Sequence, residues 1–132
     1  MKIQLLIILN LPLVVNLRAG SATWNLNPTS GDWNTAANWT PATVPNGATD
    51  LATFGVPNTT NIDLSAGVQV DSIVFNPGAS DYSLTLATGP SDTGLTIGGV
   101  GIVNNSGATQ TFILPRGSLW LRTDPVARSA HR

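Results

Sequence analysis

The chain has 132 residues and a formal net charge of -1, and it contains no cysteine. This length fits a single domain with one modest core. Without cysteine the protein has neither disulfides nor thiolate metal sites, so its stability has to come from packing and backbone pairing. Between Ala19 and Pro115 the only charged side chains are aspartates. The absence of cations from this stretch argues against nucleic-acid binding.

The amino-terminal end reads MKIQLLIILNLPLVVNLRAGSA. Lys2 precedes an apolar stretch from Leu5 to Leu17, and small residues follow at 19–22, which is the order of a secretory signal peptide. The apolar stretch is shorter than the roughly 20 residues that a membrane-spanning helix needs. We therefore expect residues 1–22 to be a cleaved signal peptide, and the mature protein to be exported with no membrane span.

Three tryptophans distinguish the next segment, residues 23–50, which reads TWNLNPTSGDWNTAANWTPATVPNGATD. The segment is rich in the turn formers Gly, Pro and Asn. Exposed aromatic rings flanked by Asn and Asp can stack on sugars, whereas buried ones would cover the end of a core that has few other large side chains. We predict a capping segment with buried rings, and we keep Trp24, Trp33 and Trp39 as candidate carbohydrate-binding residues.

Residues 51–115 contain a repeat of about 11 residues, in which two apolar residues flank a third position. The pairs are Ile62 and Leu64, Ile73 and Phe75, Leu84 and Leu86, and Leu95 and Ile97. Leu51 lies one period earlier, and the register fails at Ser106. Because helix signals are scarce and the apolar residues alternate, the sequence predicts an all-β protein of short strands.

Two architectures fit a short strand in each repeat: an antiparallel β-sandwich, or a parallel β-solenoid with about 22 residues in each rung. In VQVDSIVF, Val68 and Val70 share one parity, but Ile73 and Phe75 have the other. This slip near Asp71 predicts a bulge or a corner. It favours a short parallel β-solenoid of about two to three rungs, and the antiparallel β-sandwich remains the alternative.

The opening W…GDWNTAANW…VPNG…ATF is followed by glycine-punctuated strands such as SIVFNPGASDYSLTLATG and LTIGGVGIVNNSGATQTFIL. Over about residues 22–114 this order resembles the amino-terminal part of secreted bacterial proteins with autotransporter-associated β-strand repeats. The resemblance implies a parallel β-solenoid on the bacterial surface or in the extracellular matrix. It also implies a structural or adhesive role without enzymatic activity, and it supplies no catalytic or binding residues.

Candidates for catalysis are few. Aspartates of the repeat region could pair across neighbouring strands for glycoside hydrolysis, although aspartates beside Gly, Ser and Asn are common turn formers. These residues are Asp50, Asp63, Asp71 and Asp81. His131 is too close to the end of the chain for a Ser-His-Asp site, and no acidic repeat of calcium-binding spacing occurs. We predict a non-enzymatic protein with no catalytic, cofactor-binding or metal site.

The last residues, 116–132, carry four arginines and one aspartate. This reversal of charge marks a boundary, and we expect a basic tail that is disordered or aberrant. Taken together, the sequence predicts an exported structural or adhesive surface module that is a fragment of a larger protein. Its expected partners are extracellular polysaccharide or a second copy at an open solenoid end. The alternative is a small carbohydrate-binding module that uses the three tryptophans.

Overall fold

The computed structural model describes residues 20–86, 94–113 and 119–121. This part of the chain consists of strands and one short 3-10 helix, which confirms the all-β prediction. The helix is η1 (Ala36–Asn38). The strands are β1 (Ala22–Trp24), β2 (Trp39–Thr40), β3 (Leu51–Phe54), β4 (Asn61–Leu64), β5 (Val68–Phe75), β6 (Ser83–Leu86), β7 (Leu95–Asn104), β8 (Thr111–Ile113) and β9 (Leu119–Leu121).

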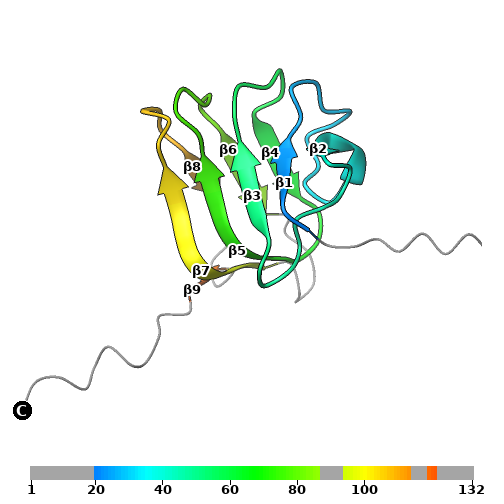
Figure 1. The fold of residues 1–132 in the computed structure, drawn as a ribbon, viewed down its shortest axis with the longest axis vertical. Coiled ribbons are helices and arrows are strands. Elements are labelled where there is room, and N and C mark those ends of the chain that lie inside the picture. The colour runs from blue at the N-terminus through cyan, green and yellow to red at the C-terminus, as the bar shows by residue number, and fades with distance from the viewer. Residues whose placement is uncertain (1–19, 87–93, 114–118, 122–132) are drawn as a thin grey trace, which may run out of the picture.

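The described strands form two sheets, with the orders β2-β1-β3-β5-β7-β9 and β4-β6-β8. Figure 1 shows β1, β3, β5 and β7 side by side in front of β4, β6 and β8. Among these strands only the β1–β2 ladder is antiparallel. Residue 51 pairs with 72 and residue 61 with 83, which are steps of 21 and 22 residues. The next parallel partners are 72 with 101 and 83 with 111, at steps of 29 and 28.

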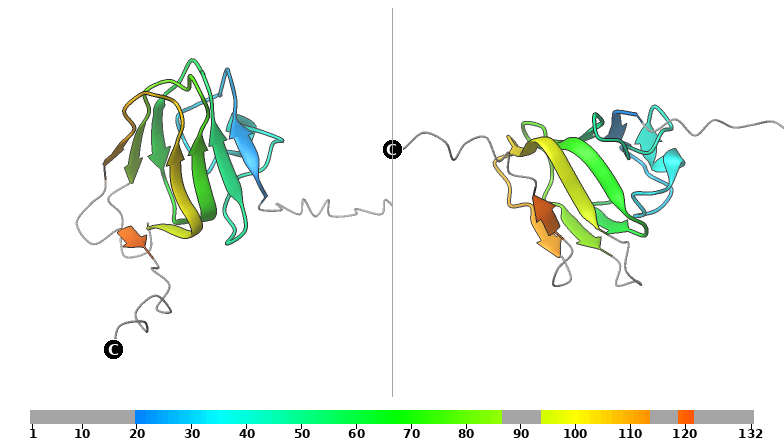
Figure 2. Two further views of the ribbon diagram at one scale, coloured as in Figure 1. Left: turned by 60° about the vertical axis from the view of Figure 1, so that its left-hand side comes forward. Right: turned by 90° about the horizontal axis from the view of Figure 1, so that it is seen from below.

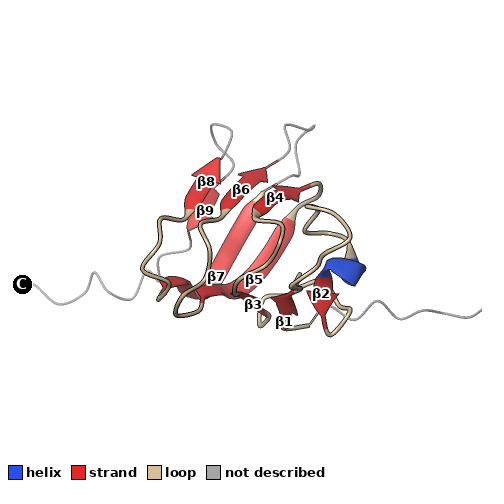
Figure 3. Ribbon diagram, turned by 90° about the horizontal axis from the view of Figure 1, so that it is seen from above, coloured by secondary structure: helices blue, strands red, loops and turns tan. Residues whose placement is uncertain are grey.

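Strands β5 and β7 each contribute to two sides of the molecule. Their carboxyl-terminal parts, 72–75 and 101–104, continue the first side, which begins with β1 and β3. The second side consists of β4, β6 and β8. On the third side, residues 68–70 and 95–97 pair with each other, and 95–97 also pair with β9. The views from below and from above show these sides around the interior (Figures 2 and 3).

The slip that the sequence predicted near Asp71 is confirmed. The β5–β7 register shifts between Val70 and Ser72, so that residue 71 faces the three residues 98–100 of β7. The burial pattern of β5 changes phase at the same place, where Ser72 and Ile73 are both buried. A bulge of this kind bends a strand, and here it forms the corner between the third side and the first.

All four apolar pairs of the repeat lie in the core. The sequence assigned Leu51 to the phase of Ile62 and Ile73, but this assignment is wrong. In β3 the buried residues are Ala52 and Phe54, one position later, and Ala52 is the partner of Ile73. The cause is the step length: β3 and β5 are 21 residues apart rather than 22, which moves the inward positions by one residue.

The predicted segment boundaries differ slightly from the strand boundaries. Strand β1 begins at Ala22, one residue before the predicted capping segment. The amino-terminal segment contributes β1 to the first side, and on the second side Asp32 forms a parallel bridge with Asp63. Residues 1–19 of the expected signal peptide lie outside the described residues. Within the predicted tail, 116–132, the described residues Leu119–Leu121 form β9 and pair with β7. Residues 116–118 and 122–132 lie outside the described range.

Candidate functional site

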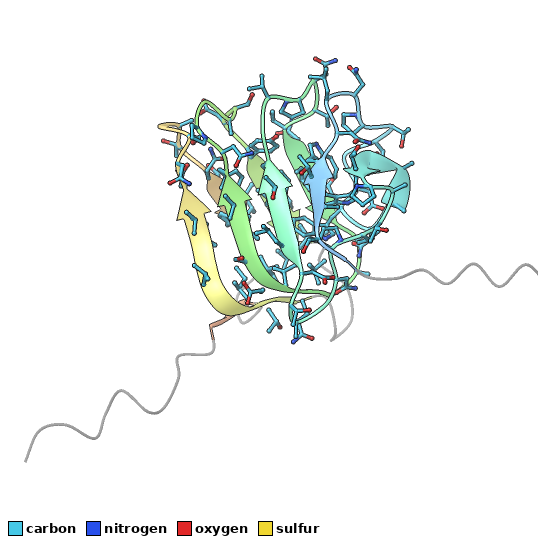
Figure 4. The ribbon with its side chains drawn as sticks, in the orientation of Figure 1. Carbon is cyan, nitrogen blue, oxygen red and sulfur yellow. The ribbon has the colours of Figure 1, made fainter. Side chains whose placement is uncertain are left out.

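The three tryptophans of the amino-terminal segment form one buried cluster, called here the tryptophan cluster (Trp24, Trp33 and Trp39). Their exposed fractions are 3%, 0% and 1%, respectively. Each comes from a different piece of backbone: Trp24 from β1, Trp33 from the bridge to β4, and Trp39 from β2. The buried apolar side chains form one core, and the tryptophan cluster lies at its amino-terminal end. Figure 4 draws the described side chains on the ribbon.

Edge-to-face packing holds the tryptophan cluster together. The ring centroids of Trp24 and Trp39 are 5.0 Å apart at an interplanar angle of 82°, and those of Trp33 and Trp39 are 4.9 Å apart at 69°. These geometries match the preferred arrangement of aromatic quadrupoles, which adds about 0.5–1.5 kcal/mol per pair beyond burial. Phe54 of β3 contacts all three rings, at centroid distances of 6.2, 5.7 and 5.6 Å.

Each indole N–H of the tryptophan cluster donates to a backbone carbonyl. Trp24 donates to Thr59 at 3.1 Å, Trp33 to Pro45 at 3.0 Å, and Trp39 to Trp33 at 2.7 Å. A buried N–H without an acceptor would cost about 1–3 kcal/mol. These bonds therefore fix the orientation of each ring as well as its burial.

The burial of these rings corrects one candidate assignment. Trp24, Trp33 and Trp39 were candidate carbohydrate-binding residues, but a sugar stacks on a solvent-exposed ring face, and these faces are covered by one another and by Phe54. Burial of the three rings stabilises the fold more than their exposure would, because each indole removes a large apolar area from water. In this structure the tryptophan cluster plugs the core and presents no sugar-binding surface.

Asn38 is the side chain at this site that the sequence did not reveal. It is fully buried in η1, and its Oδ1 accepts from Thr29 N, Thr29 Oγ1 and Ser30 N at 2.8, 2.9 and 3.1 Å. Its Nδ2 donates to Ser30 Oγ at 2.9 Å and to the carbonyl of Asp32 at 2.7 Å. An asparagine between Ala and Trp matches no sequence motif. In the fold, its amide forms hydrogen bonds with the backbone of the turn that brings Trp33 into the core.

Asp32 links the amino-terminal segment to the turn after β4. Its Oδ1 accepts from Ser65 Oγ at 2.7 Å and from Asn34 N at 3.2 Å, and its Oδ2 accepts from Thr35 Oγ1 at 2.8 Å. Partial burial by itself would raise the pKa of Asp32, but hydrogen bonds from Ser65, Thr35 and the backbone outweigh this effect and hold the pKa below its usual value. The carboxylate is therefore a structural acceptor.

The structure does not gather the four candidate aspartates of the repeat region into one group. Asp50 and Asp71 lie in adjacent layers at the corner of the first and third sides, where Asp71 N donates to the carbonyl of Asp50 at 2.8 Å. Asp63 faces solvent on β4, beside Asp32. Asp81 lies in the turn before β6. In the described ranges no three acidic or histidine side chains come together in a way that could hold a metal ion.

A shallow depression of about 250 Å³ lies on the second side. Its lining consists of Asn61, Asp81, Tyr82, Ser83, Thr109 and Thr111. The Tyr82 hydroxyl points away from it and donates to the carbonyl of Gly55 at 3.0 Å, and burial raises the pKa of this phenol. With a single carboxylate, the depression offers hydrogen bonds but lacks the paired acid and base that hydrolysis needs.

Comparisons with known proteins identified no relative: no protein-family model matches the chain, and neither a curated protein nor a solved structure does. Within the part of the chain that the structure describes, no helix is long and apolar enough to cross a membrane.

Fluorescence quenching tests the burial of the tryptophan cluster. A Trp120→Phe variant leaves Trp24, Trp33 and Trp39 as the only tryptophans. Because all three are buried, we expect blue-shifted emission that acrylamide quenches weakly and that soluble polysaccharides leave unchanged. The urea-unfolded variant gives the reference for full exposure. Red-shifted, readily quenched emission before unfolding would contradict the burial of the tryptophan cluster.

The lowered pKa of Asp32 predicts a pH dependence of stability. A carboxylate whose pKa is lower in the folded state stabilises the fold above its unfolded value, near 3.8, and this contribution is lost as the pH falls through the folded value. We expect the urea midpoint of the wild-type protein to fall more between pH 6 and pH 3 than that of Asp32→Asn. Asp81→Asn, an exposed change, is the control. Equal falls for wild type and Asp32→Asn would refute this role.

Proposed function

We propose that this protein is an exported, non-enzymatic structural module of a bacterial surface protein, built as a short parallel β-solenoid. The observation that carries the proposal is the parallel pairing of successive strands on the first and second sides at similar steps along the chain. In such a fold each layer pairs its N–H and C=O groups with the next one. The product is a stiff rod that holds other parts of a protein away from the cell.

The amino-terminal end supports this proposal because it has the features of a solenoid cap. Strand β2 runs antiparallel to β1 and covers its outer edge through Thr23–Thr40 and Trp24–Trp39. A further parallel strand cannot add at an edge that is already paired. The tryptophan cluster covers the apolar interior behind that edge. A repeat protein needs such terminal units for solubility.

The other end of the described core differs in its exposure. Ala22, Ala52 and Ile73 form an inward row and are buried, but the next partner in that row, Ile102, is 46% exposed. On the second side, the inward partner of the buried Leu84 is Phe112 of β8, which is only partly buried. This end is suited to receive another layer of the same kind, and in the proposed function it supports self-association. In an adhesive role, the second class of binding partner is extracellular polysaccharide.

Export is the part of the proposal that depends on the amino-terminal sequence. The order of Lys2, an apolar stretch and small residues at 19–22 is that of a secretory signal. The chain is also free of cysteine, so its folding outside the cytoplasm does not depend on an oxidant. Packing and hydrogen bonds stabilise the described core without disulfides.

Pairs of introduced cysteines test the parallel architecture cleanly, because the chain has none of its own. Thr53 is the partner of Val74, and Asp63 is the partner of Thr85. Both pairs face outward at about the 4.8 Å spacing of neighbouring strands, so we expect a short bifunctional thiol reagent to crosslink each pair in more than about half of the molecules. An antiparallel meander would not bring both pairs together.

The control for this experiment is the pair Thr53→Cys and Thr85→Cys, whose members lie on the first and second sides. This pair should not crosslink within one molecule. Peptide mapping of the crosslinked chain identifies the linked residues. Crosslinking of the control pair, or of neither parallel pair, would overturn the solenoid.

Self-association tests the role of the exposed end. If the end of the core receives a second copy, Ile102→Lys should weaken association measured by sedimentation at least about tenfold, because a charge in a buried apolar contact is costly. Val56→Lys is the matched control, since Val56 is 63% exposed on a turn. Equal effects of the two changes, or a wild-type chain that stays monomeric at high concentration, would contradict self-association at this end.

A further inference from the structure

The turn before β3 contains an asparagine followed by glycine, at Asn46 and Gly47. Asparagine in this pair is the most reactive amide in proteins, because a following residue without a side chain leaves its backbone nitrogen unhindered. Asn46 is also exposed to solvent. The chain thus carries a chemically labile pair at its surface, in the loop that precedes the first β-repeat.

The fold explains why both residues are present. Asn46 Oδ1 accepts from the backbone N–H of Gln69 at 2.8 Å, and Asn46 Nδ2 donates to the carbonyl of Gly67 at 3.4 Å. The side chain therefore bonds to the edge of β5 at a place where backbone groups need partners. Gly47 leaves room for the Asp50 carboxylate, because a Cβ atom at residue 47 would lie 2.9 Å from Asp50 Oδ2 and would displace it.

The same contacts restrain the reactive group. Both ends of the Asn46 amide are held by the chain around β5, and Asn46 N donates to Asp50 Oδ2 at 3.1 Å. Asp50 is only 7% exposed, and its own N–H donates to the carbonyl of Gly47 at 2.9 Å. Turning the amide toward the nitrogen of Gly47 would break its hydrogen bonds to Gln69 and Gly67.

We propose that Asn46 is a deamidation site that the fold holds inactive and that opening of segment 46–50 activates. The backbone nitrogen of Gly47 attacks Cγ of Asn46 and loses its proton to solvent, the Cγ–Nδ2 bond breaks, and ammonia leaves with a proton from solvent. Water then opens the resulting succinimide to aspartate or isoaspartate. The net reaction consumes one water and releases one ammonia, with no change of oxidation state.

The product changes the contact irreversibly. An aspartate at position 46 has no N–H to donate to Gly67, and it places a second carboxylate beside Asp50. Isoaspartate also lengthens the backbone by one atom. Either product weakens the attachment of segment 46–50 to β5, so a converted chain opens more readily than an unconverted one. The fraction of converted chains therefore reflects the total time that this segment has spent open.

The test is site-specific mass spectrometry of the full chain, incubated at mildly alkaline pH with and without denaturing urea. Conversion at Asn46 should be at least about tenfold faster in the unfolded chain, because local opening has to precede reaction in the folded one. Asn105, which precedes Ser106, is the internal comparison. Equal rates at Asn46 in the two conditions, or no conversion in urea, would overturn the proposal.

Two variants locate the restraint. Gln69→Pro removes the N–H that holds Asn46 Oδ1, and Asp50→Ala removes the acceptor of Asn46 N. Either one should accelerate conversion in the folded chain several-fold, whereas Asp81→Ala, an exposed aspartate in another turn, should not. Circular dichroism confirms which variants remain folded, and Asp50→Ala serves if proline disrupts β5. If folded variants convert at the wild-type rate, the contact with β5 is not the restraint.

Discussion

The contact on which the rest of this structure depends is that between Phe54 and its aromatic neighbours. Phe54 packs against all three rings of the tryptophan cluster, and it also stacks on Phe75 of the next layer at 5.2 Å and 24°. Tyr82 contacts both phenylalanines, at 5.0 and 5.6 Å. One side chain thus joins the irregular amino-terminal segment to the regular strands. Since no disulfide and no cation supports the described core, this aromatic column provides much of its cohesion.

Hydrogen bonds from polar side chains, rather than ion pairs, connect the layers of the described core. Asp32 reaches Ser65, Asn46 reaches Gln69, and Gln110 accepts from Tyr82 N while it donates to the carbonyl of Ser80. In the part of the chain that the structure describes, every buried side-chain nitrogen or oxygen has a partner. These hydrogen bonds fix the register of the turns, as the strand ladders fix that of the strands. None of them joins two opposite charges, so their strength depends less on salt than that of surface ion pairs.

The sequence predicted the strands better than their connections. Apolar pairs such as Ile62 and Leu64 are visible because burial alternates along a strand, and the slip at Asp71 is visible because it reverses that alternation. The step between layers depends on turn lengths, which composition does not determine, and for this reason Leu51 was placed out of phase. Parallel pairing joins residues far apart in the chain, so the sequence indicated it only indirectly, through the slip near Asp71. The role of Asn38 was hidden for the same reason, because its partners depend on the folded turn.

The inward row that runs from Ala22 through Ala52 and Ile73 to Ile102 has a consequence for the evolution of such a chain. Each strand of this row pairs with the strands of the layers before and after it. A tandem duplication of one layer in the gene would therefore add length without disturbing the tryptophan cluster, whose contacts end at the first layers. In the proposed solenoid, a change in copy number would alter the length of the module, while the amino-terminal segment stays the same.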